Sequence, residues 1–335
     1  FIKCIKGHAG FHSCERCTQK GESKQYRLTF PFSQEHPVRT DDEFNALHYM
    51  HTHQLSRSPL LELGFPCVKG FCLDYMHLVC LGVVKRMLWY LTRGPRCCCL
   101  SKQQAKIVSD HLVTFSSNMP SEFSRQPRSL DFVKYWKATE FRQFLLYTGA
   151  IVLKNVVSKD MYHHFLCLSV GVSILLDERE EIRHHYLNFA RSLLLLFVSR
   201  SSQLFGDTFI VHNVHNLIHL ADDVEYFSCS LNRLSCFSFE NHLRTIKEFV
   251  RNPKNPIAQV AKRLNEQCPF SCSVGSELTQ HGYISTQAKD RCFLVDNQFA
   301  FVMSKRRNGY FECEVVKKES TESFFKLPLN DEVFE

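Results

Sequence analysis

The sequence predicts a mainly helical protein with α+β parts and a small β module near its C-terminal end. Apolar residues recur at helical spacing from Leu60 to Phe205, whereas short aromatic and β-branched segments follow Gly275. The chain has 335 residues, of which 44% are hydrophobic and 22% charged. This composition is typical of a folded protein with a sizeable core.

Residues 1–57 form the first predicted part, a loop-rich region with a cysteine pair and one or two strands. The segment Tyr26-Arg27-Leu28-Thr29-Phe30 alternates between polar and apolar residues, and Pro31 and Pro37 mark turns. Residues 58–205 form the second part, a helical domain. Its longest apolar run, from Ser192 to Ser199, is far shorter than the roughly 20 residues that span a bilayer. We therefore expect a buried helix there and no membrane partner.

Two further helices are expected over 212–227 and 237–250, within a third part that covers residues 206–267. Residues 275–335 form the β module. Its predicted strands are 291–295, 299–303 and 310–316, with turns at Asp296-Asn297 and Asn308-Gly309.

The cysteine usage and the charge limit the classes of protein. The chain has sixteen cysteines, but they are scattered and no secretory signal precedes them, so we expect reduced thiols in an intracellular protein. The net charge of +7 permits a polyanionic partner without requiring one. Because the chain begins with Phe1 and not with methionine, we interpret it as a fragment.

Cys14 and Cys17 form a C-x-x-C motif, whose two sulfurs can chelate one zinc ion. A single pair is half of a site. His8 and His12 are nearby candidates for the other half, as are Asp74 and His77, which share one helix face at i and i+3. The alternatives are two ordinary loop cysteines, or a redox pair, which the missing βαβ pattern disfavours.

His215 and His219 are spaced i, i+4, as in helical metal sites of metalloproteases. That motif needs a glutamate after the first histidine, where this chain has Asn216. Hydrogen-bonded packing of the two histidines is therefore favoured over a metal hydrolase. Asp222 and Asp223 follow, as carboxylates for a hard cation or as part of a solvated face.

Glu240 lies on a predicted helix whose apolar stripe is expected to be buried. The stripe consists of Phe239, Leu243, Ile246 and Val250. Beside it, Glu240 is followed by Arg244, Lys247 and Arg251, which suits a surface that holds a metal ion and phosphates. The alternative is a surface ion pair between Glu240 and Arg244.

A second basic stretch is interleaved with aromatic residues and permits either nucleic-acid contact or inward packing of the rings. It comprises Arg125, Arg128, Lys134, Lys137 and Arg142, with Phe123, Tyr135, Trp136 and Phe141.

Several motifs occur together in one order. They are Ile5-Lys6-Gly7-His8 before the C-x-x-C, the segments 73–83, 136–142 and 145–149, then Asn213 to Leu220 and Phe237-Ser238-Phe239-Glu240-Asn241. Over residues 1–267 this set resembles the animal branch of the CACTA (En/Spm)-type DDE transposases.

The resemblance implies the C-terminal portion of a ribonuclease H-like core, interrupted by a helical insertion before its final acidic residue. In that family two aspartates and one glutamate bind two Mg²⁺ or Mn²⁺ ions for phosphodiester chemistry on transposon-end DNA in the nucleus. Glu240 matches the glutamate, and Arg244, Lys247 and Arg251 would contact DNA. Cys14, Cys17, Asp74 and His77 match motifs for which we expect a joint role, with structural Zn²⁺ as a cofactor.

The family's two aspartates precede its C-x-x-C motif, and no acidic residue precedes Cys14 here. The resemblance therefore implies a transposase-derived protein that is inactive as this chain, with a self-associating homo-oligomer as a further expectation. The alternative is a domesticated, non-catalytic scaffold that binds DNA or protein.

Overall fold

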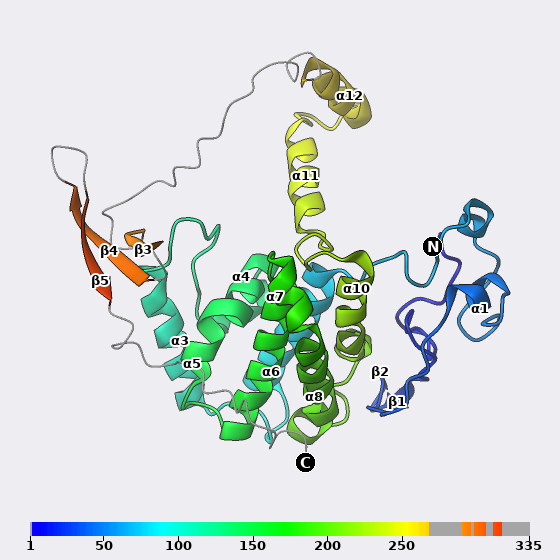
Figure 1. Cartoon of the computed structure of the whole chain (residues 1–335), viewed down its shortest axis with the longest axis horizontal. Coiled ribbons are helices and arrows are strands. Elements are labelled where there is room, and N and C mark those ends of the chain that lie inside the picture. Colours follow the sequence, from blue (N-terminus) through cyan, green and yellow to red (C-terminus); the bar gives the residue numbers. More distant parts are fainter. Residues whose placement is uncertain (1, 268–289, 296–297, 306–310, 317–335) are drawn as a thin grey trace. The chain divides into compact units, whose positions relative to one another are not determined.

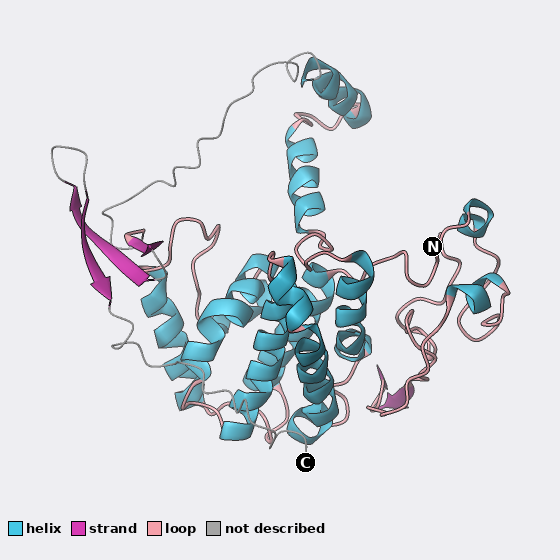
Figure 2. Ribbon diagram, in the orientation of Figure 1, coloured by secondary structure: helices cyan, strands magenta, loops and turns pink. Residues whose placement is uncertain are grey.

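The computed structural model describes residues 2–267, 290–295, 298–305 and 311–316. The chain divides into two compact units (Figure 1). The first contains residues 1–113 and 127–271, and the second contains residues 114–126 and 272–335. Helices dominate the first unit and a small sheet lies in the second, as the ribbon in Figure 2 shows. The predicted mainly helical class with a C-terminal β module is confirmed.

The N-terminal region of the first unit is loop-rich, as predicted. Its strands β1 (Glu22–Lys24) and β2 (Arg27–Thr29) form an antiparallel hairpin with Glu22 opposite Thr29. The short helix α1 (Asp41–Asn45) is capped by Thr40, whose hydroxyl accepts a hydrogen bond from the Glu43 amide. Phe44, Tyr49, Cys67 and Val68 form a small local core.

Seven helical segments lie between α1 and position 149. They are η1 (Pro59–Leu63), η2 (Met76–Val84), α2 (Lys85–Arg93), α3 (Lys102–Ser116), η3 (Leu130–Tyr135), α4 (Ala138–Gln143) and η4 (Phe144–Thr148). Of these, η2 and η4 are wound as π-helices. The helical pattern predicted from Leu60 onward is therefore confirmed.

The helices α6 (Lys159–Leu176) and α8 (Leu187–Phe205) pack side by side, after α5 (Gly149–Leu153) and on either side of α7 (Glu180–His185). The glycine at position 171 permits this approach, because a Cβ there would lie 3.2 Å from the Leu194 side chain. Leu193, Leu194, Phe197 and Val198 are buried on α8, which confirms the buried apolar run. None of the helices in the described part of the chain combines the length and the apolar character needed to cross a membrane.

Three consecutive helical segments form the predicted helix over 212–227: α9 (His212–His215), η5 (Asn216–His219) and α10 (Leu220–Phe227). The segment α9 packs against η2. A Cβ at Gly82 of η2 would lie 2.4 Å from Nδ2 of Asn213, so glycine permits the close contact. This contact holds the histidine-bearing turn against the helical core.

The helix α11 (Phe237–Glu248) exists as predicted and is followed by α12 (Pro256–Gln267), but the expectation of a buried apolar stripe is wrong. No residue of α11 is buried, and the Phe239 and Leu243 residues are 68% and 57% exposed. Helical spacing shows that an apolar face exists, but it does not show that the same chain covers that face.

The described part of the second unit contains the antiparallel sheet β3 (Cys292–Val295), β4 (Gln298–Lys305) and β5 (Phe311–Val316). Cys292 lies opposite Phe301, and Phe299 lies opposite Val316. All three predicted strands are confirmed within one or two residues at their ends. The predicted turns at Asp296-Asn297 and Asn308-Gly309 lie outside the described residues.

Candidate metal centre

Cys14 and Cys17 lie in a tight turn before the β1–β2 hairpin and are completely buried. The backbone amide of Cys17 donates to the sulfur of Cys14 at 3.3 Å, and the two sulfurs are 3.5 Å apart. The turn therefore points both sulfurs to the same side, as the C-x-x-C spacing predicted.

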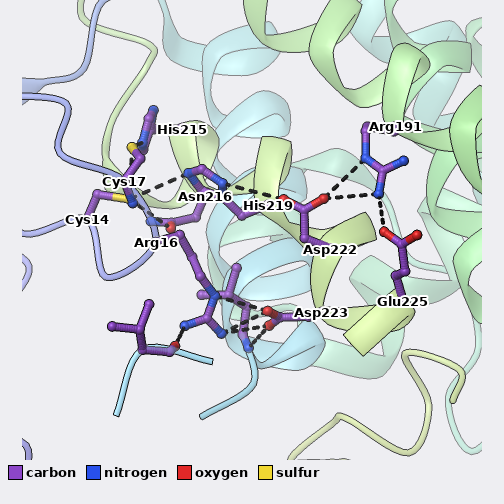
Figure 3. Close-up of polar contacts among 12 residues, drawn as sticks. Cys14, Arg16, Cys17, Arg191, His215, Asn216, His219, Asp222, Asp223 and Glu225 are labelled. Carbon is purple, nitrogen blue, oxygen red and sulfur yellow. Dashed lines mark hydrogen bonds and ion pairs between the residues drawn. The ribbon is translucent and has the colours of Figure 1, made fainter. Parts of the chain in front are cut away.

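His215 and His219 complete the cluster from the other side (Figure 3). Nε2 of His215 lies 3.3 Å from the sulfur of Cys17, and Nε2 of His219 lies 3.6 Å from that of Cys14. Both histidines are buried. One ligand atom from each of the four residues lies within 4.8 Å of all the others, so the group could hold a metal ion.

The distances fit a tetrahedral ion. With Zn–S bonds of about 2.3 Å and Zn–N bonds of about 2.0–2.1 Å, neighbouring ligand atoms are about 3.3–3.8 Å apart. The three measured separations, 3.5, 3.3 and 3.6 Å, fall within this range. The four side chains thus lie as the ligands of one ion would.

Surrounding residues orient both histidine rings. Phe30, one residue after β2, stacks on His215 with ring centroids 5.2 Å apart. Nδ1 of His219 lies 4.0 Å from the carboxylate of Asp222, which accepts hydrogen bonds from Arg191. At this separation Asp222 is a charged neighbour of the His219 ring and not its hydrogen-bond acceptor, although a carboxylate in this place is common behind a ligating histidine.

The two thiols differ in acidity because they share hydrogen bonds. Burial acts to raise the pKa of Cys14, but hydrogen bonds from Cys17, His215 and His219 outweigh it and hold the pKa well below its usual value. The hydrogen bond to Cys14, followed by burial, raises the pKa of Cys17. The surroundings thus favour the thiolate form at Cys14 over that at Cys17, and a bound cation would favour the thiolate form of both.

The donor set favours a structural role for the ion. Four protein ligands leave no position for a reacting water, whereas catalytic zinc sites keep one open. Asn216 occupies the place of the metalloprotease glutamate, and its Nδ2 donates to the His212 carbonyl at 2.8 Å. The arrangement lacks a general base next to its first histidine.

A buried ion pair lies beside this cluster (Figure 3). Arg16, between the two cysteines, donates from Nε and Nη2 to the two carboxylate oxygens of Asp223, each at 3.0 Å. Asp223 follows His219 by one helical turn. The C-x-x-C turn and the α9–η5–α10 segment are therefore linked twice, by the cysteine–histidine cluster and by this ion pair.

The structure places Asp74 and His77 in a different group from Cys14 and Cys17. Their neighbour is Cys236, which lies just before α11. Burial acts to raise the pKa of Asp74, but hydrogen bonds from Cys236 and His77 outweigh it and lower the pKa. The partners of the cysteine pair are the two histidines that the sequence favoured as hydrogen-bonded packing.

Glu240, Arg244, Lys247 and Arg251 are all exposed, on α11 and just after it. Arg244 pairs with Glu248 at 3.2 Å, at i and i+4. The ion pair considered from sequence, between Glu240 and Arg244, is therefore replaced by one in the next turn.

In the second basic stretch the inward packing of rings holds for Trp136 and Phe141, which are buried and lie 5.6 Å apart. Arg128 binds the buried Glu140 with two hydrogen bonds, of 2.6 and 2.9 Å. Tyr135 remains exposed, with Lys134 over its ring. Two rings of this stretch thus pack inward, whereas Arg125, Lys134 and Lys137 remain exposed.

No protein-family model matches this chain, and searches of curated proteins and of solved structures find no match either.

Proposed function

We propose that this chain is a transposase-derived DNA-binding scaffold, related to the CACTA type and to its ribonuclease H-like core, with one structural Zn²⁺. The observation that carries the proposal is α11, a helix with no buried residue that presents Glu240 together with Arg244 and Lys247. The order of motifs along residues 1–267 supports the same origin. Its site of action would be the nucleus, where its DNA partner lies.

Zinc is the metal that the donor set favours. Two cysteine sulfurs and two imidazole nitrogens suit a borderline-soft ion, whereas Mg²⁺ and Ca²⁺ prefer oxygen ligands. Such an ion would join the N-terminal turn to the α9–η5 segment. Its role is to stabilise the scaffold that carries α11.

The exposed apolar stripe of α11 also supports the proposed ancestry. Phe239 and Leu243 present apolar surface to solvent. Burial of that surface would stabilise the chain by about 25 cal/mol per Å². In a ribonuclease H-like core, a helix with this pattern packs its stripe on a sheet. The polar side of α11, which carries Glu240, would then remain directed toward the DNA.

DNA binding tests the proposal through the salt dependence of affinity. The triple substitution Arg244→Gln, Lys247→Gln and Arg251→Gln keeps good or moderate helix formers and removes three exposed cations. If all three contact phosphates, the slope of log K against log salt concentration becomes less steep by about 2.7.

The matched control removes three other exposed cations, Arg96, Lys102 and Lys106, by the same substitution. The net charge then changes equally in both variants, and we expect the control to keep nearly the full slope. Fluorescence anisotropy with labelled duplex DNA measures the salt dependence of DNA affinity for both variants. Equal losses in the two variants would show a non-specific charge effect and contradict the assignment to α11.

A further inference from the structure

Asp74, His77 and Cys236 form a second group of metal-ligating side chains, separate from the buried centre. One ligand atom from each lies within 4.8 Å of the others. Asp74 lies two residues before η2 and His77 is its second residue, whereas Cys236, 162 residues after Asp74, is the N-cap residue of α11. The group therefore joins the starts of two helices.

The carboxylate of Asp74 organises the group. Its Oδ1 accepts from the amides of Cys236 at 2.7 Å and Met76 at 3.2 Å, while Oδ2 accepts from the His77 amide at 3.0 Å. Nδ1 of His77 also contacts Oδ2. The imidazole of His77 pairs with this carboxylate and the thiol of Cys236 lies beside it, so an oxygen, a nitrogen and a sulfur atom converge.

The group is accessible to solvent, unlike the buried centre. The side chain of His77 is 56% exposed and that of Asp74 is 20% exposed. Cys236 is half-buried. An ion could therefore enter and leave without unfolding the chain.

We propose that Asp74, His77 and Cys236 form a second, exchangeable site for a borderline-soft divalent ion such as Zn²⁺. One oxygen, one nitrogen and one sulfur ligand suit such an ion, and the thiolate disfavours Mg²⁺. Three protein ligands leave the fourth position to a water molecule. Binding releases the thiol proton of Cys236 to solvent, and the ring proton of His77 moves to Nε2 so that Nδ1 can ligate.

Occupancy of this site would control the start of α11. The starts of η2 and α11 are joined by the hydrogen bond from the Cys236 amide to Asp74 and by the contact between the Tyr75 and Phe237 rings, whose centroids are 6.2 Å apart. A metal would add a further link through the sulfur of Cys236. The amide of Glu240 donates to the Cys236 carbonyl at 2.8 Å, so the restraint reaches the acidic residue one turn further along.

A cobalt titration tests the site independently of DNA binding. Untagged chain is first loaded with Zn²⁺ and then dialysed against a mild chelator, which leaves the buried centre filled. Co²⁺ is then added, because its visible absorption reports tetrahedral geometry and thiolate ligation. We expect one further equivalent of Co²⁺ with a thiolate charge-transfer band in the wild-type chain.

The variants Cys236→Ser and His77→Gln should weaken this second equivalent by more than about tenfold. They change accessible side chains, so circular dichroism should confirm an unchanged fold. Cys72→Ser, at an exposed thiol outside the group, is the matched control and should bind as the wild type does. The proposal is overturned if the wild-type chain takes up no second equivalent, or if Cys236→Ser retains it.

Discussion

Arg16 and Asp223 form a buried ion pair whose closest atoms, Nη2 and Oδ1, lie 2.8 Å apart. Each side chain is only 5% exposed. Arg16 also donates to the carbonyls of Val68 and Phe71, and Asp223 accepts from the Leu73 amide at 2.6 Å. The pair thus holds the C-x-x-C turn, the segment before η2 and α10 together.

Breaking this pair on one side should destabilise the chain strongly. Asp223→Asn leaves a buried guanidinium without its counter-charge, and Arg16→Met leaves a buried carboxylate, each at about 3–5 kcal/mol. Burial already raises the pKa of Asp223 despite Arg16, so its ionised form depends on that partner. Urea unfolding of the zinc-loaded chain measures the loss.

The double variant Arg16→Met with Asp223→Asn should recover part of the stability, because it leaves no buried charge. A double variant as unstable as the sum of the singles would show that the two residues do not act as a pair.

Removing the structural metal should lower the thermal unfolding midpoint. The four ligands come together only in the folded chain, so the free energy of metal binding is available only to the native state. Cys14→Ser and His219→Asn should each reduce bound zinc to well below one equivalent, as measured by elemental analysis, and should abolish the effect of a strong chelator on the midpoint.

The control for these variants is Cys4→Ser, at a partly exposed thiol outside the metal-ligating groups. It should retain one tightly bound zinc. Zinc-free wild-type protein with an unchanged unfolding midpoint would rule out a structural ion.

Acid should destabilise the chain through His164. Burial lowers the pKa of His164 from 6.5 to about 4, despite a hydrogen bond from Nε2 to the Phe197 carbonyl at 2.8 Å. The pKa of His164 is lower in the folded chain than in the unfolded chain, so protonation favours unfolding. The contribution of neutral His164 to the free energy of unfolding is therefore complete above pH 6.5 and is lost as the pH falls toward 4. The loss is about 3 kcal/mol across that interval.

The variant His164→Gln can keep a donor toward Phe197 but does not titrate. The difference in unfolding free energy between wild type and variant should therefore change between pH 6.5 and 4 and stay constant above it. A difference that is independent of pH would show that His164 has the same pKa in the folded and the unfolded chain, and would contradict the prediction.

The chain alone should not cleave DNA. A two-metal site needs at least two bridging anionic ligands to offset the charge of paired Mg²⁺ ions, and the resemblance supplies only Glu240. We expect purified chain with Mg²⁺ or Mn²⁺ to leave transposon-end DNA intact. Cleavage that depends on the metal and disappears in Glu240→Ala would contradict this expectation.

Local sequence patterns predicted the elements well, because helices and strands are encoded by nearby residues. The strands of the β module and the helices around His215 and Glu240 follow this rule. The partners of the C-x-x-C could not be found in this way. Cys14 and His219 are 205 positions apart in the sequence. The C-x-x-C spacing does not indicate which histidines lie beside the cysteines, and the i, i+4 spacing does not indicate which cysteines lie beside the histidines.

Two signals in the sequence were compatible with the observed site. A cysteine pair is half of a Cys₂His₂ site, and an i, i+4 histidine pair is the other half. Asn216 argued against a hydrolase, but it says nothing about a structural ion. The exposure of α11 could not be predicted from the sequence either. Helical periodicity indicates an apolar face, but it does not indicate which segment, if any, packs against that face.

The span between Cys14 and His215 also determines when the metal centre can form during synthesis. At about 5–20 residues per second, a ribosome needs about 10–40 s to add the 200 residues between them. During that interval the two cysteines have no imidazole partners from this segment. Ligation by all four residues must therefore wait until His219 has been synthesised, and a chain terminated before His215 would lack half of the donor set.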